Sequence, residues 1–217
     1  KAENFFKSQL DAKLSLNKKL NFLTNIKLKN FSLQDVNKVF DVNVIKGNLN
    51  LESSLKGNIK KKEKFYNTIT GTTTITSKEI VINNLNLNSL KTDLKKLKNL
   101  ESLDDVRKNL FNGNTYIRDQ KVKLLHDKDI IKVPLTKIKI SEDYIATSGE
   151  YNIIEKKINL TSNYQDSQSL LSLFSLNTIG NISNPMTKLS FNEIAVTKVL
   201  EKIIKKRMKK VLEKKLE

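Results

Sequence analysis

Apolar and polar residues alternate along much of this chain, and this period-two pattern is the feature that most restricts its fold. The clearest stretch places apolar residues at Leu10, Ala12, Leu14 and Leu16, and the pattern resumes at Phe22, Ile26 and Leu28. Successive side chains of a β-strand point to opposite faces, so each of these stretches presents one apolar face. The intervening Lys18-Lys19 predicts a turn between two neighbouring strands.

The same pattern predicts strands over most of the remaining chain. The expected strands cover residues 44–57, 65–76, 80–87, 116–125, 130–140, 144–154, 156–164, 178–185 and 187–191. Residues 65–76 and 80–87 are expected to form a hairpin, because polar Ser77-Lys78-Glu79 separates two β-branched runs. Asn184-Pro185 indicates an edge or corner, since proline cannot donate to a strand ladder. Residues 169–176 fit a short helix or a strand.

Helical spacing replaces the alternation in three places. Residues 32–40 fit a short helix that follows a capping serine. Apolar residues recur every three or four positions in residues 89–111, which predicts one helix, or two with a break at 99–102. From Asn192 onward there is no Gly or Pro, and one helical stripe is formed by Ile194, Val199, Leu200, Ile203, Ile204, Met208, Val211, Leu212 and Leu216.

The other face of this terminal helix is strongly basic. Its candidate contacts with a membrane or a partner are Lys202, Lys205, Lys206, Arg207, Lys209 and Lys210. The helix fits three roles: closing the core, docking on a partner or an anionic membrane, or binding nucleic acid. Core closure is favoured. Nucleic-acid binding is favoured least, because the helix is poor in the Arg and aromatic residues that read bases.

These patterns predict a mostly β fold with helices, in the α+β class. We expect an antiparallel meander curled into a groove-like sheet, with a C-terminal amphipathic helix. The whole of residues 1–217 is expected to form one domain. Within it, hairpins occupy 8–88, a helical insertion 89–112, later strands 114–191 and the terminal helix 192–216.

The charge balance admits two explanations. The formal net charge is +17, from 40 Lys and Arg against 23 Asp and Glu. Such an excess is typical of surfaces that bind nucleic acid or anionic membranes. Lys and Asn are also enriched by AT-rich coding sequences, and this explanation is favoured because Lys greatly outnumbers Arg. The chain has no Cys, which excludes disulfides and thiolate metal sites.

Motifs of known catalytic sites are absent from the sequence, so we expect no enzyme activity and no cofactor. The densest polar group, His126-Asp127-Lys128-Asp129, fits either a metal site or a turn between strands, and the turn is favoured. Asp104-Asp105 is expected on a solvated helix face.

Four segments, in this order, resemble the C-terminal region of the AsmA family. They are DVNVIKGNLNLESSLKGN (41–58), GTTTITSKEIVINNLNL (71–87), IKISEDYIATSGEYNIIEKKINL (138–160) and TIGNISNPMTKLSF (178–191). The first three are similar to the family's strand and hairpin repeats, and the fourth is similar to its Asn-Pro strand before a terminal helix. The turn glycines of the family's hairpins are replaced here, by Lys78 or Glu79 and by Asp143 or Tyr144.

The resemblance implies a noncatalytic lipid-handling or outer-membrane assembly module of Gram-negative bacteria. It implies a periplasmic location and an inner-membrane anchor outside this chain. Phospholipid acyl chains are then the expected partner, held in an apolar groove lined by Leu14, Leu16, Phe22, Ile26, Leu49, Leu51, Ile75, Leu85, Leu87, Val133, Leu135, Ile138 and Ile140. The alternatives are a sealed core at these positions and an envelope module whose basic helix docks on a protein or an anionic membrane.

Overall fold

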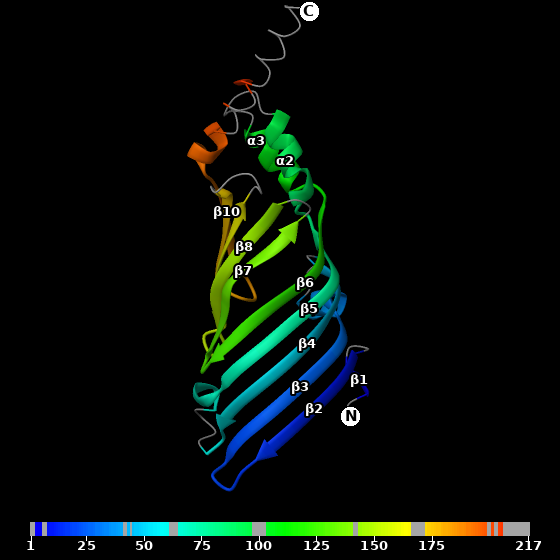
Figure 1. Ribbon diagram of the computed structural model, residues 1–217, viewed down its shortest axis with the longest axis vertical. Coiled ribbons are helices and arrows are strands. Elements are labelled where there is room, and N and C mark those ends of the chain that lie inside the picture. Colours follow the sequence, from blue (N-terminus) through cyan, green and yellow to red (C-terminus); the bar gives the residue numbers. More distant parts are fainter. Residues whose placement is uncertain are drawn as a thin grey trace, which may run out of the picture.

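The computed structural model shows a long, curled antiparallel sheet with three helical segments, residues 87–96, 103–110 and 193–198, at one end (Figure 1). The structure describes residues 3–5, 8–40, 43, 45–60, 65–96, 103–140, 143–165, 172–198, 201, 204 and 205. Eleven strands within these ranges form one sheet, and each strand pairs with its neighbours in sequence order. The meander predicted from the sequence is therefore confirmed.

The strands are β1 (Glu3–Phe5), β2 (Ser8–Leu16), β3 (Asn21–Ser32), β4 (Ile45–Asn58), β5 (Thr70–Asn83), β6 (Asn114–Asp127), β7 (Ile130–Ile140), β8 (Asp143–Asn152), β9 (Lys157–Gln165), β10 (Ser172–Asn181) and β11 (Met186–Phe191). The helices are α1 (Leu33–Phe40), the 3₁₀ turn η2 (Tyr66–Thr68), α2 (Leu87–Lys96) and α3 (Leu103–Leu110). Residues 193–198 are also helical, as are residues 201, 204 and 205.

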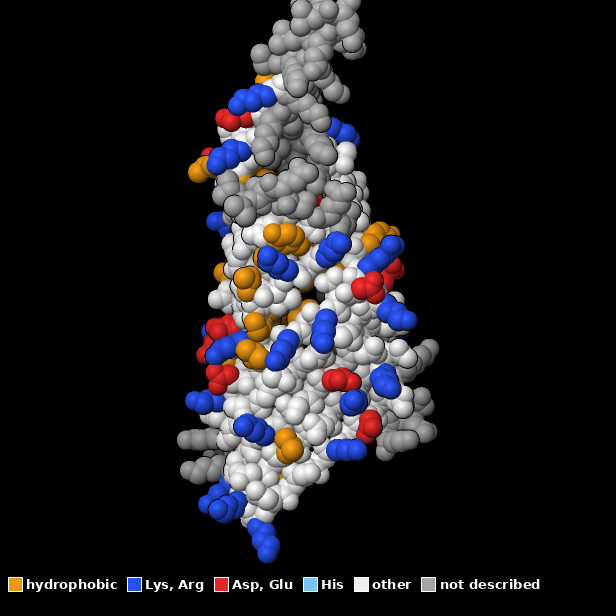
Figure 2. All heavy atoms as spheres, in the orientation of Figure 1, with side chains coloured by type: hydrophobic (Ala, Val, Ile, Leu, Met, Phe, Trp, Pro, Cys, Tyr) orange, Lys and Arg blue, Asp and Glu red, His pale blue; other side chains and the backbone are white. Residues whose placement is uncertain are grey.

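Residues that lie opposite one another show that the sheet has two unlike faces. One row across β2–β6 joins Leu10, Leu28, Leu51, Ile75 and Val122. The adjacent row, on the opposite face, joins Asp11, Lys27, Glu52, Thr74 and Lys123. We call the first the inner face and the second the outer face. Figure 2 shows the outer face over β2–β6, where charged side chains predominate and hydrophobic ones are few.

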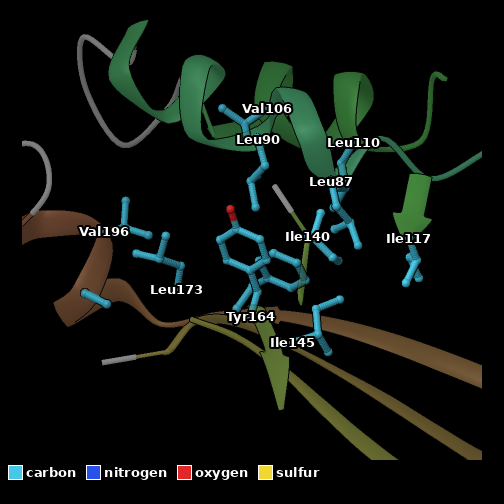
Figure 3. Packing of buried hydrophobic residues seen from close by; sticks show 12 residues of the cluster. Leu87, Leu90, Val106, Leu110, Ile117, Ile140, Ile145, Tyr164, Leu173 and Val196 are labelled. Atoms are coloured by element: carbon cyan, nitrogen blue, oxygen red, sulfur yellow. The ribbon is translucent and has the colours of Figure 1, made fainter. Parts of the chain in front are cut away.

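The inner face continues across the second half of the sheet. A row across β7–β11 joins Ile138, Ile145, Tyr164, Phe174 and Phe191. Here helices cover the sheet, as Figure 3 shows: leucines and a valine of α2 and α3 point onto Tyr164 and Ile140, and Val196 approaches from the terminal helix. Tyr164 and Phe174 stack with ring centroids 5.1 Å apart. This half of the sheet therefore holds a packed core.

The predicted hairpin at residues 65–87 is wrong. Residues 70–83 form the single strand β5, which pairs with β4 on one side and β6 on the other. Ser77-Lys78-Glu79 lies in a bulge of this strand, where the register with β4 shifts between Gly47 and Asn50. Ser77 is buried, and Glu79 pairs with Arg118. A bulge absorbs an extra residue without reversing the chain, so the polar triplet interrupts the alternation but not the strand.

Other predicted elements are confirmed. The helix at 32–40 is α1, the helical region at 89–111 contains α2 and α3, and the undecided segment 169–176 contributes to strand β10. The terminal helix starts at residue 193, directly after β11. The predicted break at 99–102 lies outside the described residues, as does the part of the terminal helix from 206 onward.

Candidate functional site

The inner face of β2–β6 is an apolar surface that lies mostly outside the packed core. Its strands alternate between half-buried apolar or small residues on this face and exposed residues on the outer face, most regularly in β3 and β4. Among the described helices, α1 packs on β4, while α2 packs on β6 and α3 at the helical end of the sheet. Away from these contacts, the described residues provide no second layer over this half of the sheet.

Seven of the predicted lipid contacts lie on this inner face, outside the packed core. They are Leu14, Leu16, Ile26, Leu49, Leu51 and Ile75 in β2–β5, and Val133 in β7. Leu14 is 70% exposed although it lies on the inner face. Its strand, β2, is the outermost long strand of the sheet, with only the three-residue β1 beyond it. Leu85 and Ile138 lie at the border, where they pack against the core cluster.

Four of the predicted contacts lie elsewhere. Leu87 and Ile140 are buried within the packed core, and Phe22 is buried near Phe65, with ring centroids 5.5 Å apart. These three side chains are sealed by protein rather than open to a ligand. Leu135 is 68% exposed, within the bulge between Val133 and Thr136. Pro134 disturbs the strand there, so the alternation from which Leu135 was assigned to the groove does not hold.

The register also adds residues that the sequence interpretation left out of the groove. Leu10, Leu28 and Val122 belong to the same inner row as Leu51, and Leu124 lies two positions beyond Val122 in β6. Their alternation was visible in the sequence. The missing information was which residues of distant strands lie opposite one another, and that is set by the pairing of the whole sheet.

One chain of polar side chains interrupts the apolar inner face. Ser53 Oγ lies 2.7 Å from Thr73 Oγ1, which lies 2.7 Å from His126 Nε2. These residues come from β4, β5 and β6, so the hydrogen bonds tie three strands together. Partial burial lowers the pKa of the His126 imidazole below its ordinary value of 6.5, because desolvation disfavours the charged ring.

The lowered pKa of His126 predicts a loss of stability in weak acid. The unfolded chain binds a proton at His126 more readily than the folded chain does. Stability is therefore greatest above about pH 6.5 and falls as the pH drops through the lowered pKa of the folded state. Urea unfolding midpoints measured between about pH 7.5 and about pH 5 test this. His126→Gln should flatten part of the pH dependence; an unchanged profile in that variant would assign the dependence to other groups.

The predicted turn at His126-Asp127-Lys128-Asp129 is confirmed for Lys128-Asp129, whereas His126 and Asp127 belong to strand β6. Strand β6 ends at Asp127 and β7 begins at Ile130. Lys132 Nζ donates to Asp127 Oδ2 at 2.7 Å, and this bond lowers the pKa of the exposed carboxyl. Within the described ranges, no group of three or more His, Asp or Glu side chains is arranged to hold a metal ion. Asp104 and Asp105 are exposed on α3, as predicted.

The start of the terminal helix helps to close the core. Ala195 and Val196 are buried in the cluster with Phe174, while Ile194 is exposed. Of the basic candidates, Lys205 is exposed, and Lys202, Lys206, Arg207, Lys209 and Lys210 lie outside the described residues. None of the helices in the described part of the chain is long and apolar enough to cross a membrane.

The fold and the inner face define the chain as an open, curled antiparallel sheet with one apolar side. Comparison of the chain with protein-family models, with curated proteins and with solved structures gave no significant match. The proposals below therefore rest on the residues of this chain and on their arrangement.

Proposed function

We propose that this chain is a noncatalytic lipid-handling module whose inner face over β2–β6 holds phospholipid acyl chains. The observation that carries the proposal is the contrast between the two halves of one sheet. The row that contains Tyr164 and Phe174 is covered by helices, whereas the equivalent apolar row that contains Leu28, Leu51 and Ile75 has no such cover among the described residues. An extended apolar surface of this kind is typical of a site that binds an apolar partner.

The chemistry of the inner face suits acyl chains better than a small polar ligand. Each buried methylene group of an acyl chain contributes about 0.8 kcal/mol, wherever along an apolar row it lies. Aliphatic residues repeated across five strands offer many equivalent positions, so a chain can shift along them at little cost. The polar link Ser53–Thr73–His126 is the main directional feature on this face.

The resemblance to the AsmA family extends the proposal to a cellular setting. In that setting the module lies in the periplasm of a Gram-negative bacterium, is anchored to the inner membrane by another part of its protein, and conducts phospholipids toward the outer membrane. The open curled sheet supports this reading because it has the one-sided apolar architecture that the resemblance implies.

Two acidic substitutions on the inner face provide the test. We expect Leu14→Asp combined with Leu51→Asp to reduce bound phospholipid about tenfold, a change equivalent to losing fewer than two buried methylene contacts. The measurement is native mass spectrometry with lipid extraction on protein purified from a bacterial host. Removal of fluorescent phospholipid from vesicles provides a second readout.

The matched control places the same two charges on the outer face. Leu23 is 48% exposed on the outer face of β3, and Ser54 is exposed on the outer face of β4. Leu23→Asp combined with Ser54→Asp should leave lipid binding within about twofold of the parent chain. Circular dichroism checks that both double variants fold. A folded parent chain without copurified or extractable lipid would contradict the proposal.

A structural or interaction module is the second candidate. Its specific support is the outer face, where a shallow hollow is lined by Lys27, Lys29 and Lys121 and by one acidic residue, Glu52, which pairs with Lys27. A surface of this charge can dock on an anionic membrane or on an acidic envelope protein. Flotation with anionic vesicles, without extraction of labelled lipid, would favour this candidate over the first.

A further inference from the structure

Strands β6 and β7 pair only next to the turn that joins them. Three residue pairs are formed, from Asp127 with Ile130 to Leu125 with Lys132. Beyond them, β6 pairs with β5 alone and β7 with β8 alone. Figure 1 shows the two strands diverging from this hairpin toward the helices. The described sheet is thus split along the middle, and the split has a sequence cause on each side.

On the β7 side, the split begins after Lys132, the last residue that pairs with β6, and Pro134 lies two positions further along. Proline has no backbone N–H to donate to a ladder, and the register between β7 and β8 shifts here as well. On the β6 side, Asp119 has a left-handed backbone, with φ 48°. Gln120 Nε2 donates to the Arg118 carbonyl oxygen at 2.5 Å, and Thr136 Oγ1 donates to the Pro134 carbonyl oxygen at 2.7 Å. The carbonyl oxygens of Arg118 and Pro134 therefore accept hydrogen bonds from side chains of their own strands.

The β6–β7 hairpin closes one end of the split, and toward the other end its two strands carry Ile117 and Ile140, which are buried in the packed core. We call the opening between these two ends the window. A cavity of about 560 Å³ lies at the window, lined by Asn88, Tyr116, Arg118, Asp119, Gln120 and Lys139. Figure 2 shows a hollow in the middle of this face with Lys and Arg side chains around it.

The two sides of the window differ in chemistry. Val122 and Ile138 belong to the inner face, whereas Arg118 and Lys139 lie toward the outer face. Arg118 Nε lies 3.2 Å from Glu79 Oε2, and Lys139 forms no ion pair with a described residue. Asp119 contributes a second carboxylate beside Glu79, so the mouth carries two cations and two anions, and Lys139 is the cation that no described carboxylate pairs. A phospholipid has apolar acyl chains and an anionic phosphate. The apolar residues on the inner face suit the acyl chains, and the cations on the outer face suit the phosphate.

We propose that glycerophospholipid enters and leaves the inner face sideways, through the window between β6 and β7, with its phosphate held at the outer mouth by Arg118 and Lys139. The inference rests on the proposed lipid-handling function and assigns the route within it. The packed core fills the helical end of the inner face, so a lipid cannot leave the inner face at that end. The window between β6 and β7 lies next to this core and offers a lateral exit.

Bridging the window should stop lipid exchange without removing the binding surface. Gln120 in β6 and Lys137 in β7 lie on the two strands that border the window, one on each side of it. The chain has no cysteine, so Gln120→Cys with Lys137→Cys can be joined selectively by a flexible bis-maleimide. The control joins Leu125→Cys with Lys132→Cys, which already lie opposite each other in the ladder. Exchange of fluorescent phosphatidylglycerol between the protein and vesicles is measured before and after bridging.

We expect the bridge across the window to slow exchange at least about tenfold and the bridge at the hairpin to change it by less than about twofold. Protein that is loaded before bridging should retain its lipid. Equal exchange rates in the two bridged proteins, with lipid still bound, would overturn the window and leave the proposed function standing. A parent chain that binds no lipid would overturn both.

The phosphate contact is tested separately by removing the two cations. Arg118→Gln with Lys139→Gln should slow exchange of phosphatidylglycerol about tenfold, as expected for the loss of hydrogen bonds to a charged group. Arg107→Gln with Lys108→Gln removes the same charge from the exposed face of α3 and serves as the control. If both variants exchange lipid at the same rate, the assignment of the phosphate to Arg118 and Lys139 is wrong.

Discussion

Phe174→Ala is expected to destabilise the fold by about 3–5 kcal/mol, a large share of the stability of a domain of this size. Phe174 is 1% exposed and stacks on Tyr164, while its other neighbours include Phe191, whose ring centroid is 6.2 Å away. The substitution leaves a cavity among elements that cannot easily collapse, because strands on one side and helices on the other hold the lining in place.

Urea unfolding followed by circular dichroism measures this effect. Phe111→Ala is the matched control, because Phe111 is 49% exposed just after α3 and its loss should change stability by less than about 1 kcal/mol. Equal losses in the two variants would mean that the cluster around Phe174 does not hold the helical end together. The hydroxyl of Tyr164 provides a further tie, since it donates to Asp143 Oδ2 at 2.6 Å.

The sequence predicted most of the fold because the alternation is strong and the connections are short. The first two predicted strands correspond to β2 and β3, since Leu10, Leu14, Phe22 and Ile26 follow the period of two, whereas the short strand β1 was not predicted. Local physics suffices for this step: the alternation sets the face of each strand, and polar turns set its ends. In an antiparallel meander, neighbours in sequence are neighbours in space, so the order of the strands followed as well.

Bulges caused the main errors. A bulge adds a residue on one strand only, so it breaks the alternation in the same way that a turn does. At Ser77-Lys78-Glu79 the break was interpreted as a turn, and at Pro134-Leu135 it was overlooked. In both places the neighbouring strands decide the outcome: β5 stays one continuous strand because it pairs with β4 and β6 on both sides of the bulge, and β8 pairs with β7 on both sides of Pro134.

The candidate site was only partly predictable for a different reason. Leu51 and Ile140 are both alternating apolar residues at strand positions, and nothing in their local sequence separates them. Their difference arises from α2, α3 and residues 193–198, which cover one half of the sheet and leave the other without a second layer of described residues. The β6–β7 window likewise depends on two neighbouring strands that pair at only three residue pairs. The sequence of either strand alone does not predict this.

Gly149→Ala is expected to destabilise the chain by about 3 kcal/mol or more, which combines an unfavourable backbone conformation with a steric collision. Gly149 has φ +151°, and a Cβ at this position would collide with the carbonyl oxygen of Asn159 on β9. That oxygen belongs to the backbone of a paired strand, so it can move only if the ladder between β8 and β9 opens.

Gly180→Ala separates the cost of the unfavourable backbone conformation from the cost of the steric collision. Gly180 also has a positive φ, +105°, but a Cβ there would meet no atom within 4 Å, so only the conformational cost of about 1 kcal/mol is expected. Thermal and urea unfolding of the two variants provide the measurement. If Gly149→Ala were no worse than Gly180→Ala, the close approach at Gly149 would not be needed for the fold.

The same collision recurs at two other strand glycines, and this points to a shared role in curling the sheet. A Cβ at Gly71 would meet the carbonyl oxygen of Ser54, and one at Gly47 would lie 2.5 Å from the carbonyl oxygen of Glu79. Glycine within a strand permits close backbone approach and local bending, which a curved sheet requires. Gly47 and Gly71 lie in β4 and β5, so this bending helps to shape the inner face over β2–β6 on which the acyl chains are proposed to lie.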